Sequence, residues 1–155
     1  MKKMETTLLL LRRENEILLA KKKRGFGTGK YNGVGGKIES GETVEDAMIR
    51  ECIEEIHVTP TKYEKMGTIE FIEFVKNEKT NLTFNLFVAT SWIGEPKESE
   101  EMKPKWFKLD EIPYNEMFID DSYWLPIVLE GNKIKAFFEF DEDWNLLSYN
   151  IEKMI

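Results

Sequence analysis

The sequence predicts a mixed α+β domain in which two helices pack on a mixed β-sheet. Two observations support this prediction: runs rich in β-branched and aromatic residues recur along the chain, and one segment has the period of an amphipathic helix. The chain has 155 residues, of which 41% are hydrophobic and 33% charged, as is ordinary for one folded domain. We therefore expect a single domain over residues 1–155, without repeats or linkers.

The N-terminal part of the chain predicts a hairpin followed by a polar, glycine-rich loop. Apolar runs at Thr6–Leu11 and Glu16–Ala20 are separated by a short polar segment, which is typical of a hairpin. Four adjacent cations at 21–24 then precede a glycine-rich segment. The pair Asn32-Gly33 predicts a turn, and Gly35-Gly36 predicts a further position with special backbone dihedrals.

The remainder of the chain predicts a long helix, three strands, a second helix and a closing hairpin. Acidic residues at the start of the first helix suit the positive end of the helix dipole. A polar loop at 76–80 separates the two long strands. Pro126 is tolerated in the second helix because it lies near the first turn. The predicted elements are helix Thr43–Ile56, strands Gly67–Val75, Asn81–Trp92 and Lys105–Leu109, a helix from Asp120 or Asp121 to Leu129, and a hairpin of Ile134–Phe140 and Asn145–Asn150.

Charge and cysteine content exclude several classes of function. Lys and Arg number 22 against 29 Asp and Glu, so the formal net charge is −7. A chain this acidic has no electrostatic reason to coat a nucleic-acid polymer or an anionic membrane. The only cysteine, Cys52, cannot form an internal disulfide, which suits a reducing compartment. The apolar run Leu8–Leu11 is too short for a signal-peptide core or a membrane span, so we expect a cytoplasmic protein.

The predicted helix at 43–56 places acidic and apolar residues on two different faces. On a helical wheel, Glu51, Glu54 and Glu55 fall within an arc of about 100°. A separate arc of about 140° is apolar, and it consists of Met48, Ile49, Cys52, Ile53 and Ile56. Like charges at this spacing repel, and a divalent cation would offset the repulsion. An all-oxygen site suits Mg²⁺ or Mn²⁺. The competing interpretation is an acidic face exposed to solvent.

The residues around this helix resemble the Nudix box. Gly36 leads through five residues to Glu42, and seven further residues lead to the segment Arg50-Glu51-Cys52-Ile53-Glu54-Glu55-Ile56-His57-Val58. Every charged position of the box is present at the required spacing. Two positions depart from the box: Cys52 takes an aliphatic position, and His57 replaces the closing glycine. Because that glycine ends the helix in a left-handed conformation, we predict that His57 is a strained cap and not a catalyst.

The resemblance covers nearly the whole chain and is to Nudix hydrolases of the MutT type that act on oxidised purine nucleoside triphosphates. Outside the box it depends on the motifs Lys-Lys-Arg-Gly-Phe-Gly at 22–27, Tyr31-Asn32-Gly33, Glu101-Met102, Trp106-Phe107 and Asp120-Asp121-Ser122-Tyr123-Trp124. It implies the Nudix fold, a mixed β-sheet sandwiched between α-helices. It also implies cleavage of the triphosphate, by water that Mg²⁺ activates, to the monophosphate and pyrophosphate.

The resemblance further implies which residues act on the phosphates. The implied metal ligands are the carbonyl of Gly36 and the carboxylates of Glu51, Glu54, Glu55 and Glu101. Which glutamate deprotonates the attacking water is left open. Glu101 also belongs to the acidic stretch at 98–101, which by itself is an ordinary solvated segment. Arg50 would orient the box carboxylates, Glu42 would support them, and Lys22 would approach a phosphate.

For the base, the resemblance implies a pocket with a polar end and apolar walls. Asn32, Asp120 and Asp121 would read the polar edges of the base. The implied walls are Phe26, Phe71, Phe74, Met102, Phe118 and Trp124. Taken singly, each aromatic is also an ordinary core residue, and the two aspartates are also an N-cap and its solvated neighbour. Two adjacent acids inside an aromatic pocket would raise the pKa of one of them.

The sequence thus predicts an enzyme that hydrolyses 8-oxo-dGTP and 2-hydroxy-dATP, which sanitises the nucleotide pool in the service of DNA repair. One alternative is a Nudix pyrophosphohydrolase for ordinary dNTPs or for another nucleoside diphosphate derivative. Another is a module that senses nucleotides without hydrolysis, which the presence of Glu51, Glu54 and Glu55 disfavours. We expect a monomer that binds a small-molecule nucleotide and neither a nucleic-acid polymer nor a membrane.

Overall fold

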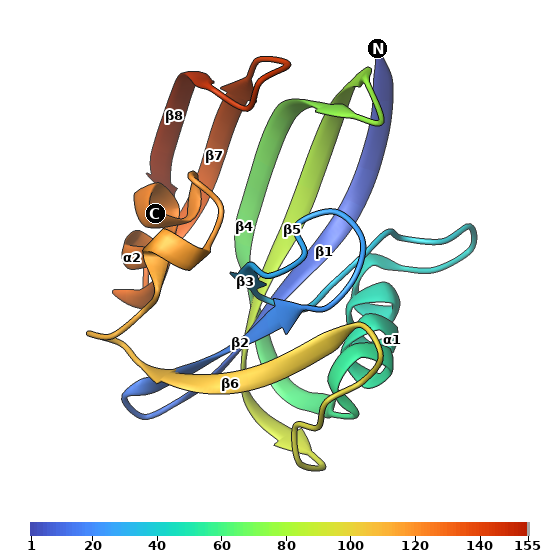
Figure 1. The fold of residues 1–155 in the computed structure, drawn as a ribbon. Coiled ribbons are helices and arrows are strands. Elements are labelled where there is room, and N and C mark those ends of the chain that lie inside the picture. The colour runs from blue at the N-terminus through green and yellow to red at the C-terminus, as the bar shows by residue number, and fades with distance from the viewer. Residues whose placement is uncertain (155) are drawn as a thin grey trace.

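The computed structural model describes residues 1–154, which form a mixed β-sheet and two α-helices (Figure 1). The strands are β1 (Lys2–Arg13), β2 (Glu16–Lys22), β3 (Tyr31–Asn32), β4 (Thr59–Val75), β5 (Glu78–Ile93), β6 (Met102–Lys108), β7 (Lys133–Phe140) and β8 (Leu146–Met154). The helices are α1 (Val44–Ile56), α2 (Asp121–Leu129) and the short 3-10 helix η1 (Tyr114–Glu116). The predicted α+β class is confirmed. In residues 1–154, no helix has the length and apolar character needed to cross a membrane.

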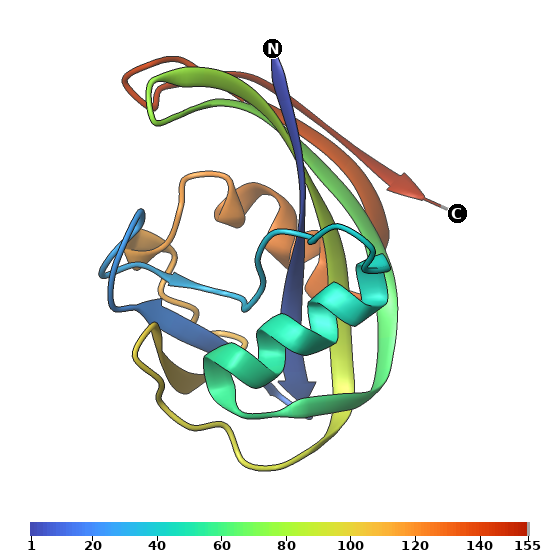
Figure 2. The ribbon, with the colours of Figure 1, turned by 90° about the vertical axis from the view of Figure 1, so that its right-hand side faces the viewer.

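The strands form one sheet in the order β3-β2-β1-β5-β4-β7-β8, and β6 pairs with β2 outside this order. β1 is parallel to β5, β4 is parallel to β7, and the other pairs are antiparallel, so the sheet is mixed as predicted. The predicted N-terminal hairpin is β1–β2. Figure 2 shows β4, β5, β7 and β8 curving as a wall, with α2 on its concave side.

Side chains on the two faces of β1 enter two different hydrophobic clusters. Leu8 and Leu10 belong to the cluster that contains Trp124 of α2. Leu9 and Leu11 belong to the cluster that contains Met48 of α1. Because alternate residues of a strand point to opposite faces, β1 separates the two helices. The two helices therefore cover opposite faces of the sheet, which is the layered arrangement that the resemblance implied.

Several strands are longer than the sequence predicts. β4 starts at Thr59 and not at Gly67, because its pairing with β5 continues through irregularities in the register. The predicted loop at 76–80 shrinks to the turn Lys76-Asn77, whose φ values of 51° and 63° suit a tight hairpin. β8 continues to Met154. In β4, bulges interrupt the alternation of polar and apolar residues, so its extension is invisible to a search for that alternation.

The predicted turn at Asn32-Gly33 is wrong. Asn32 ends β3, and the chain then runs beside β1, where Val34 and Leu9 exchange backbone hydrogen bonds of 2.7 and 3.0 Å. Gly33 is needed for space, because a Cβ there would lie 2.8 Å from the carbonyl oxygen of Leu9. At Gly35 a Cβ would overlap with the carbonyl of Thr7. This close approach holds residues 33–36, the glycine segment, against β1 and next to α1.

Candidate active site

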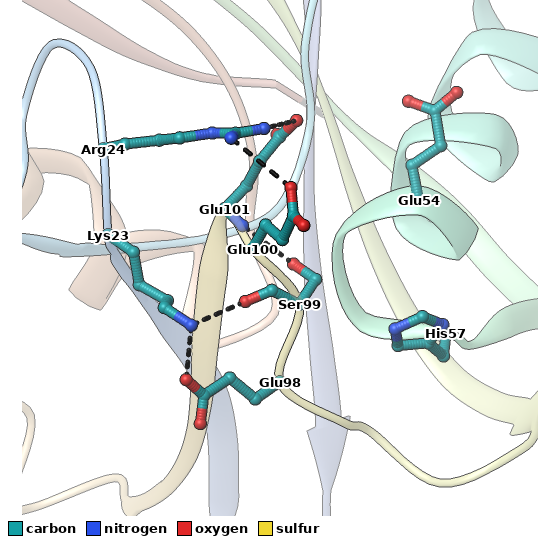
Figure 3. A pocket seen from close by; sticks show the side chains of 8 residues that line it. All are labelled: Lys23, Arg24, Glu54, His57, Glu98, Ser99, Glu100 and Glu101. Carbon is teal, nitrogen blue, oxygen red and sulfur yellow. Dashed lines mark hydrogen bonds and ion pairs between the residues drawn. The ribbon is translucent and has the colours of Figure 1, made fainter.

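Helix α1 carries the carboxylates, and its own residues define both ends. Thr43, predicted as the first helical residue, is the N-cap, and its Oγ1 accepts the N–H of Asp46 at 3.1 Å. His57 ends the helix with a left-handed φ of 62°, and its N–H donates to the carbonyl of Ile53 at 3.0 Å. The predicted strained cap at His57 is confirmed. Its exposed side chain lines an open pocket together with Glu54 (Figure 3).

Replacement of this cap should stabilise the protein. In His57→Gly the left-handed conformation no longer strains a Cβ, so the free energy of unfolding should rise by about 1 kcal/mol. In the control His57→Ala the strain remains, and no gain is expected. Urea unfolding of both variants checks this. A stability of His57→Gly at or below that of the wild type would contradict the assignment.

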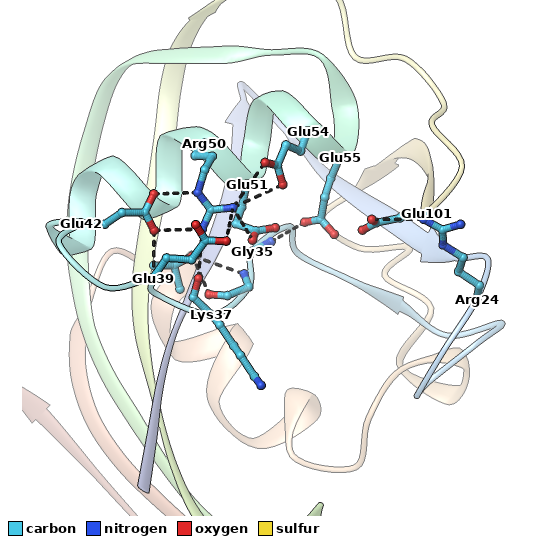
Figure 4. Close-up of polar contacts among 12 residues, drawn as sticks. Arg24, Gly35, Lys37, Glu39, Glu42, Arg50, Glu51, Glu54, Glu55 and Glu101 are labelled. Atoms are coloured by element: carbon cyan, nitrogen blue, oxygen red, sulfur yellow. Dashed lines mark hydrogen bonds and ion pairs between the residues drawn. The ribbon is translucent and has the colours of Figure 1, made fainter. Parts of the chain in front are cut away.

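Arg50 is the centre of the polar network on the acidic face (Figure 4). It donates two hydrogen bonds to Glu42, from Nε to Oε2 at 2.6 Å and from Nη2 to Oε1 at 3.0 Å. Its Nη1 donates to Oε1 of Glu51 at 2.9 Å and approaches Oε2 of Glu54 at 3.3 Å. These bonds lower the pKa of Glu42 and raise that of Arg50. The predicted pairing of Arg50 with the box carboxylates is therefore present in the structure.

Glu55 is the most deeply placed carboxylate of α1, with 3% of its surface exposed. One oxygen accepts the N–H of Gly35 at 2.7 Å. Burial raises the pKa of Glu55 to about 8, and the negative charges of Glu51 and Glu101 add to the rise. Burial is also the main cause of the raised pKa of Glu51. The carboxylates are thus close enough to disfavour each other's charge, which a cation would relieve.

The donor set fits a hard divalent cation, because it offers carboxylate and carbonyl oxygens only. Gly36 leaves space beside these oxygens, since a Cβ there would lie 2.6 Å from Cδ of Glu51. Within residues 1–154, no three acidic, His or Cys side chains converge closely enough to form a ready-made metal site. Glu51 and Glu54 instead contact Arg50, so a cation would compete with this guanidinium for them.

Glu101 approaches the same region from the segment before β6. Its Oε1 lies 3.4 Å from Nη2 of Arg24, so the guanidinium of Arg24 forms an ion pair with this carboxylate. Glu101, Glu54 and His57 line the open pocket drawn in Figure 3, and Figure 4 shows Glu101 facing Glu55. The structure therefore brings the predicted metal ligand Glu101 to the box carboxylates, although about fifty residues of chain separate it from α1.

A cavity of about 760 Å³ extends from the Glu55 end of α1 to the start of α2. Besides Gly36 and Glu55, it is lined by nearly all of the residues predicted to contact the phosphates or the base. These are Lys22, Phe26, Asn32, Phe71, Met102, Phe118, Asp120, Asp121 and Trp124. Residues distant in sequence thus share one surface.

Phe74 does not line this cavity, so its prediction as a wall is wrong. Ile69, Phe71 and Glu73 of β4 all reach the cavity. Alternate residues of a strand share a face, and Phe74 lies an odd number of positions from each of them. Its ring therefore belongs to the other face of β4, and the cavity receives the carboxyl of Glu73 instead.

The carboxyls of Asp120 and Asp121 are buried at the far end of the cavity, with 7% and 3% of each residue exposed. Oδ2 of Asp120 accepts the indole N–H of Trp124 at 2.9 Å, and Oδ2 of Asp121 accepts the N–H of Phe118 at 3.0 Å. Asp120 holds the N-cap position of α2, but its own side chain makes no capping bond. Burial raises the pKa of Asp120 to about 6, and burial with the charge of Asp120 raises that of Asp121.

The family model of the NUDIX domain matches residues 1–126, which contain α1, the glycine segment and both aspartates. The chain belongs to the NUDIX family. It is 42% identical over 148 residues to the mouse oxidized purine nucleoside triphosphate hydrolase, with 96% of this chain and 94% of that protein covered. The zebrafish protein of the same name is 39% identical over the same shares. The structure of the mutator MutT protein from Bacillus halodurans matches with a TM-score of 0.84 and 28% identity, over 96% of this chain and 97% of that one. The expected Nudix fold is confirmed.

Several residues that line the Nudix cavity were not predicted from the sequence, among them Trp144 and Glu73. Trp144, in the turn between β7 and β8, lies with its ring centroid 5.1 Å from that of Phe26 at the cavity. No local pattern indicates this contact. Glu73 carries such a signal, because it stands two positions after Phe71 in a predicted strand and must share its face.

Buried carboxyl groups predict how the stability of this Nudix protein depends on pH. The pKa values of about 6 for Asp120, 7 for Glu73 and 8 for Glu55 lie above those of an unfolded chain, near 4. The native state therefore binds more protons, so this stabilisation is full below about pH 4 and is lost as pH rises through about 6 to 8.

We accordingly expect the free energy of unfolding in EDTA to fall by at least about 1 kcal/mol between pH 5.5 and 8.5. Urea titrations at several pH values measure this change. Glu73→Gln removes one of the titrating groups and should flatten the profile. A stability that stays constant or rises over this range would contradict the assignment.

Proposed function

We propose that this protein hydrolyses oxidised purine nucleoside triphosphates, such as 8-oxo-dGTP and 2-hydroxy-dATP, to the monophosphate and pyrophosphate. One observation carries the proposal: a single cavity joins Gly36 and Glu55 of the acidic end to the buried pair Asp120 and Asp121. The names of the mouse and zebrafish relatives state the same substrate class. In a cell this reaction would remove damaged precursors of DNA and so serve its repair.

The acidic end would act on the triphosphate. The proposed ligands of Mg²⁺, or of Mn²⁺, are Gly36, Glu51, Glu54, Glu55 and Glu101. Bound there, the ion would neutralise phosphate charge and supply an activated water. Arg50 orients Glu51 and Glu54 through its Nη1. Lys22 lines the cavity near enough to Glu55 for its charge to lower that pKa, and it would bind a phosphate oxygen.

The other end would read the base. The side chain of Asn32 uses Oδ1 to accept the N–H of Gly33 at 2.8 Å, so its NH₂ group is the donor left for a ligand. Asp120 and Asp121 have raised pKa values, and a proton on either one turns an acceptor into a donor. Unmodified guanine would leave some of these polar groups unpaired, which is the proposed source of selectivity.

Pyrophosphate release from a nucleotide panel tests the proposal. The panel contains 8-oxo-dGTP, 2-hydroxy-dATP, their ribonucleotide forms and the four unmodified dNTPs, each with Mg²⁺ and with EDTA. We expect kcat/KM for the oxidised purines to exceed that for dGTP by about tenfold or more. Equal values would favour a general dNTP pyrophosphohydrolase, and binding without release from any nucleotide would favour a sensing module.

We also propose that residues 1–155 act as one monomeric domain in the cytoplasm, without nucleic-acid or membrane partners. The net charge of −7 disfavours polyanions. Cys52 is buried, and burial raises the pKa of its thiol to about 12, which suits a reduced and unreactive side chain. Light scattering on a sizing column should give a mass near 18.3 kDa. Twice that mass would reject the monomer.

A further inference from the structure

Glu73 of β4 brings a carboxyl to the sheet floor of the cavity, among apolar neighbours. It shares its face with Ile69 and Phe71 and lies opposite Thr80 of β5. Its pKa is raised to about 7, first by burial and then by the charge of Asp120. Among the described residues, no hydrogen bond or ion pair satisfies this carboxyl. A charged carboxyl in this position is unfavourable unless a ligand donates a hydrogen bond to it.

Thr6 of β1 is a second polar group on the same floor. Only 6% of this residue is exposed, and it lines the cavity. Its Oγ1 is a buried side-chain oxygen for which the described residues offer no hydrogen-bond partner. Buried polar atoms in folded proteins are nearly always paired, so this oxygen is available to water or to a polar ligand group in the cavity.

The carboxyls of the cavity come from two different elements. Asp120 and Asp121 approach from the start of α2, whereas Glu73 approaches from the sheet, and the charge of Asp120 acts on Glu73. A purine held between them would meet acceptors on two of its edges. An ordinary purine presents N7, itself an acceptor, on its imidazole edge, so a carboxylate there is repelled. Oxidation at C8 turns N7 into an N–H donor, which a carboxylate accepts.

We propose that Glu73 is a specificity-determining residue that accepts a hydrogen bond from the N7–H of a C8-oxidised purine. This contact makes purine nucleoside triphosphates oxidised at C8 better substrates than those oxidised at C2, whose N7 stays an acceptor. The inference rests on the proposed function and goes beyond it, because it distinguishes between the two oxidised substrates and names the residue responsible.

The test compares 8-oxo-dGTP with 8-bromo-dGTP, which carries a bulky C8 substituent but keeps N7 as an acceptor. In the wild type at pH 8.5, where the Glu73 carboxyl is ionised, kcat/KM should favour 8-oxo-dGTP over both 8-bromo-dGTP and 2-hydroxy-dATP. Glu73→Gln keeps the size of the side chain, and its amide oxygen can still accept from an N7–H. Its NH₂ group can also donate to an acceptor N7, so the ratio of 8-oxo-dGTP to 8-bromo-dGTP should fall by about tenfold or more. The matched control Glu70→Gln alters an exposed residue of β4, three positions away, and should leave the ratio unchanged.

Equal losses on both nucleotides in Glu73→Gln, or an unchanged ratio, would overturn the inference. A calorimetric measurement of the binding of 8-oxo-dGMP and 8-bromo-dGMP in EDTA tests the role of Glu73 separately from the proposed hydrolysis. If no triphosphate is hydrolysed but Glu73→Gln still removes a preference for 8-oxo-dGMP, the proposed hydrolysis is wrong and the role of Glu73 stands. If wild-type affinities for the two monophosphates are equal, or if neither binds, the role of Glu73 is rejected whatever the turnover.

Discussion

Glu54→Gln and Glu55→Gln should each lower kcat by about 100-fold or more while the protein stays folded. An amide keeps the shape of the side chain but lacks the charge that holds a divalent cation. Glu54 is exposed, and a glutamine at position 55 can still accept the N–H of Gly35, so neither change should unfold the chain. Turnover of 8-oxo-dGTP across a Mg²⁺ titration, with thermal midpoints, measures both effects.

Asp46→Asn on the same helix is the matched control. This aspartate is exposed in the first turn of α1, away from the box carboxylates, and its loss should leave turnover near the wild-type value. The assignment of the metal to α1 would be abandoned if both glutamine variants kept near-normal activity. Loss of activity together with a collapsed thermal midpoint would instead indicate a structural role.

Asp120→Asn and Asp121→Asn should shift the ratio of kcat/KM between 8-oxo-dGTP and 2-hydroxy-dATP by about fivefold or more. Each carboxyl is buried against one protein donor, and each has a raised pKa, so either one can carry a proton. An amide cannot gain or lose a proton in this way. Each variant is therefore restricted to one pattern of donors and acceptors, which suits one oxidised base better than the other.

A capping role for the two aspartates gives the opposite result. It predicts lower thermal midpoints for both variants with the same ratio of activities. Measurement of kcat/KM on both nucleotides alongside thermal unfolding separates the two interpretations. The hydrogen bonds to Trp124 and to the N–H of Phe118 can be accepted by an asparagine oxygen, so we expect the midpoints to change little.

The helix that carries the carboxylates, and much of its local chemistry, can be predicted from the order of the residues alone. Helical spacing alone places Glu51, Glu54 and Glu55 beside one another, and the structure shows Arg50 bonded to two of them. The strained end at His57 was equally predictable, because a helix cap depends on a few adjacent residues. The exclusion of Phe74 from the cavity was also predictable locally, because a residue three positions after Phe71 cannot share its face of a strand.

The joining of the two ends of the cavity, and the effect of burial and neighbouring charges on their carboxyl groups, depend on tertiary contacts. The pKa values of Glu55 and Asp120 rise because distant segments bury them, which no local pattern records. β4 is longer than predicted because its pairing with β5 continues through bulges. The chain after Asn32 pairs with β1 and is therefore an extended segment, not the expected turn. Pairing between strands far apart in sequence sets which groups face each other across a cavity. For that reason, the approach of Glu73 to Asp120 became visible only in the folded chain.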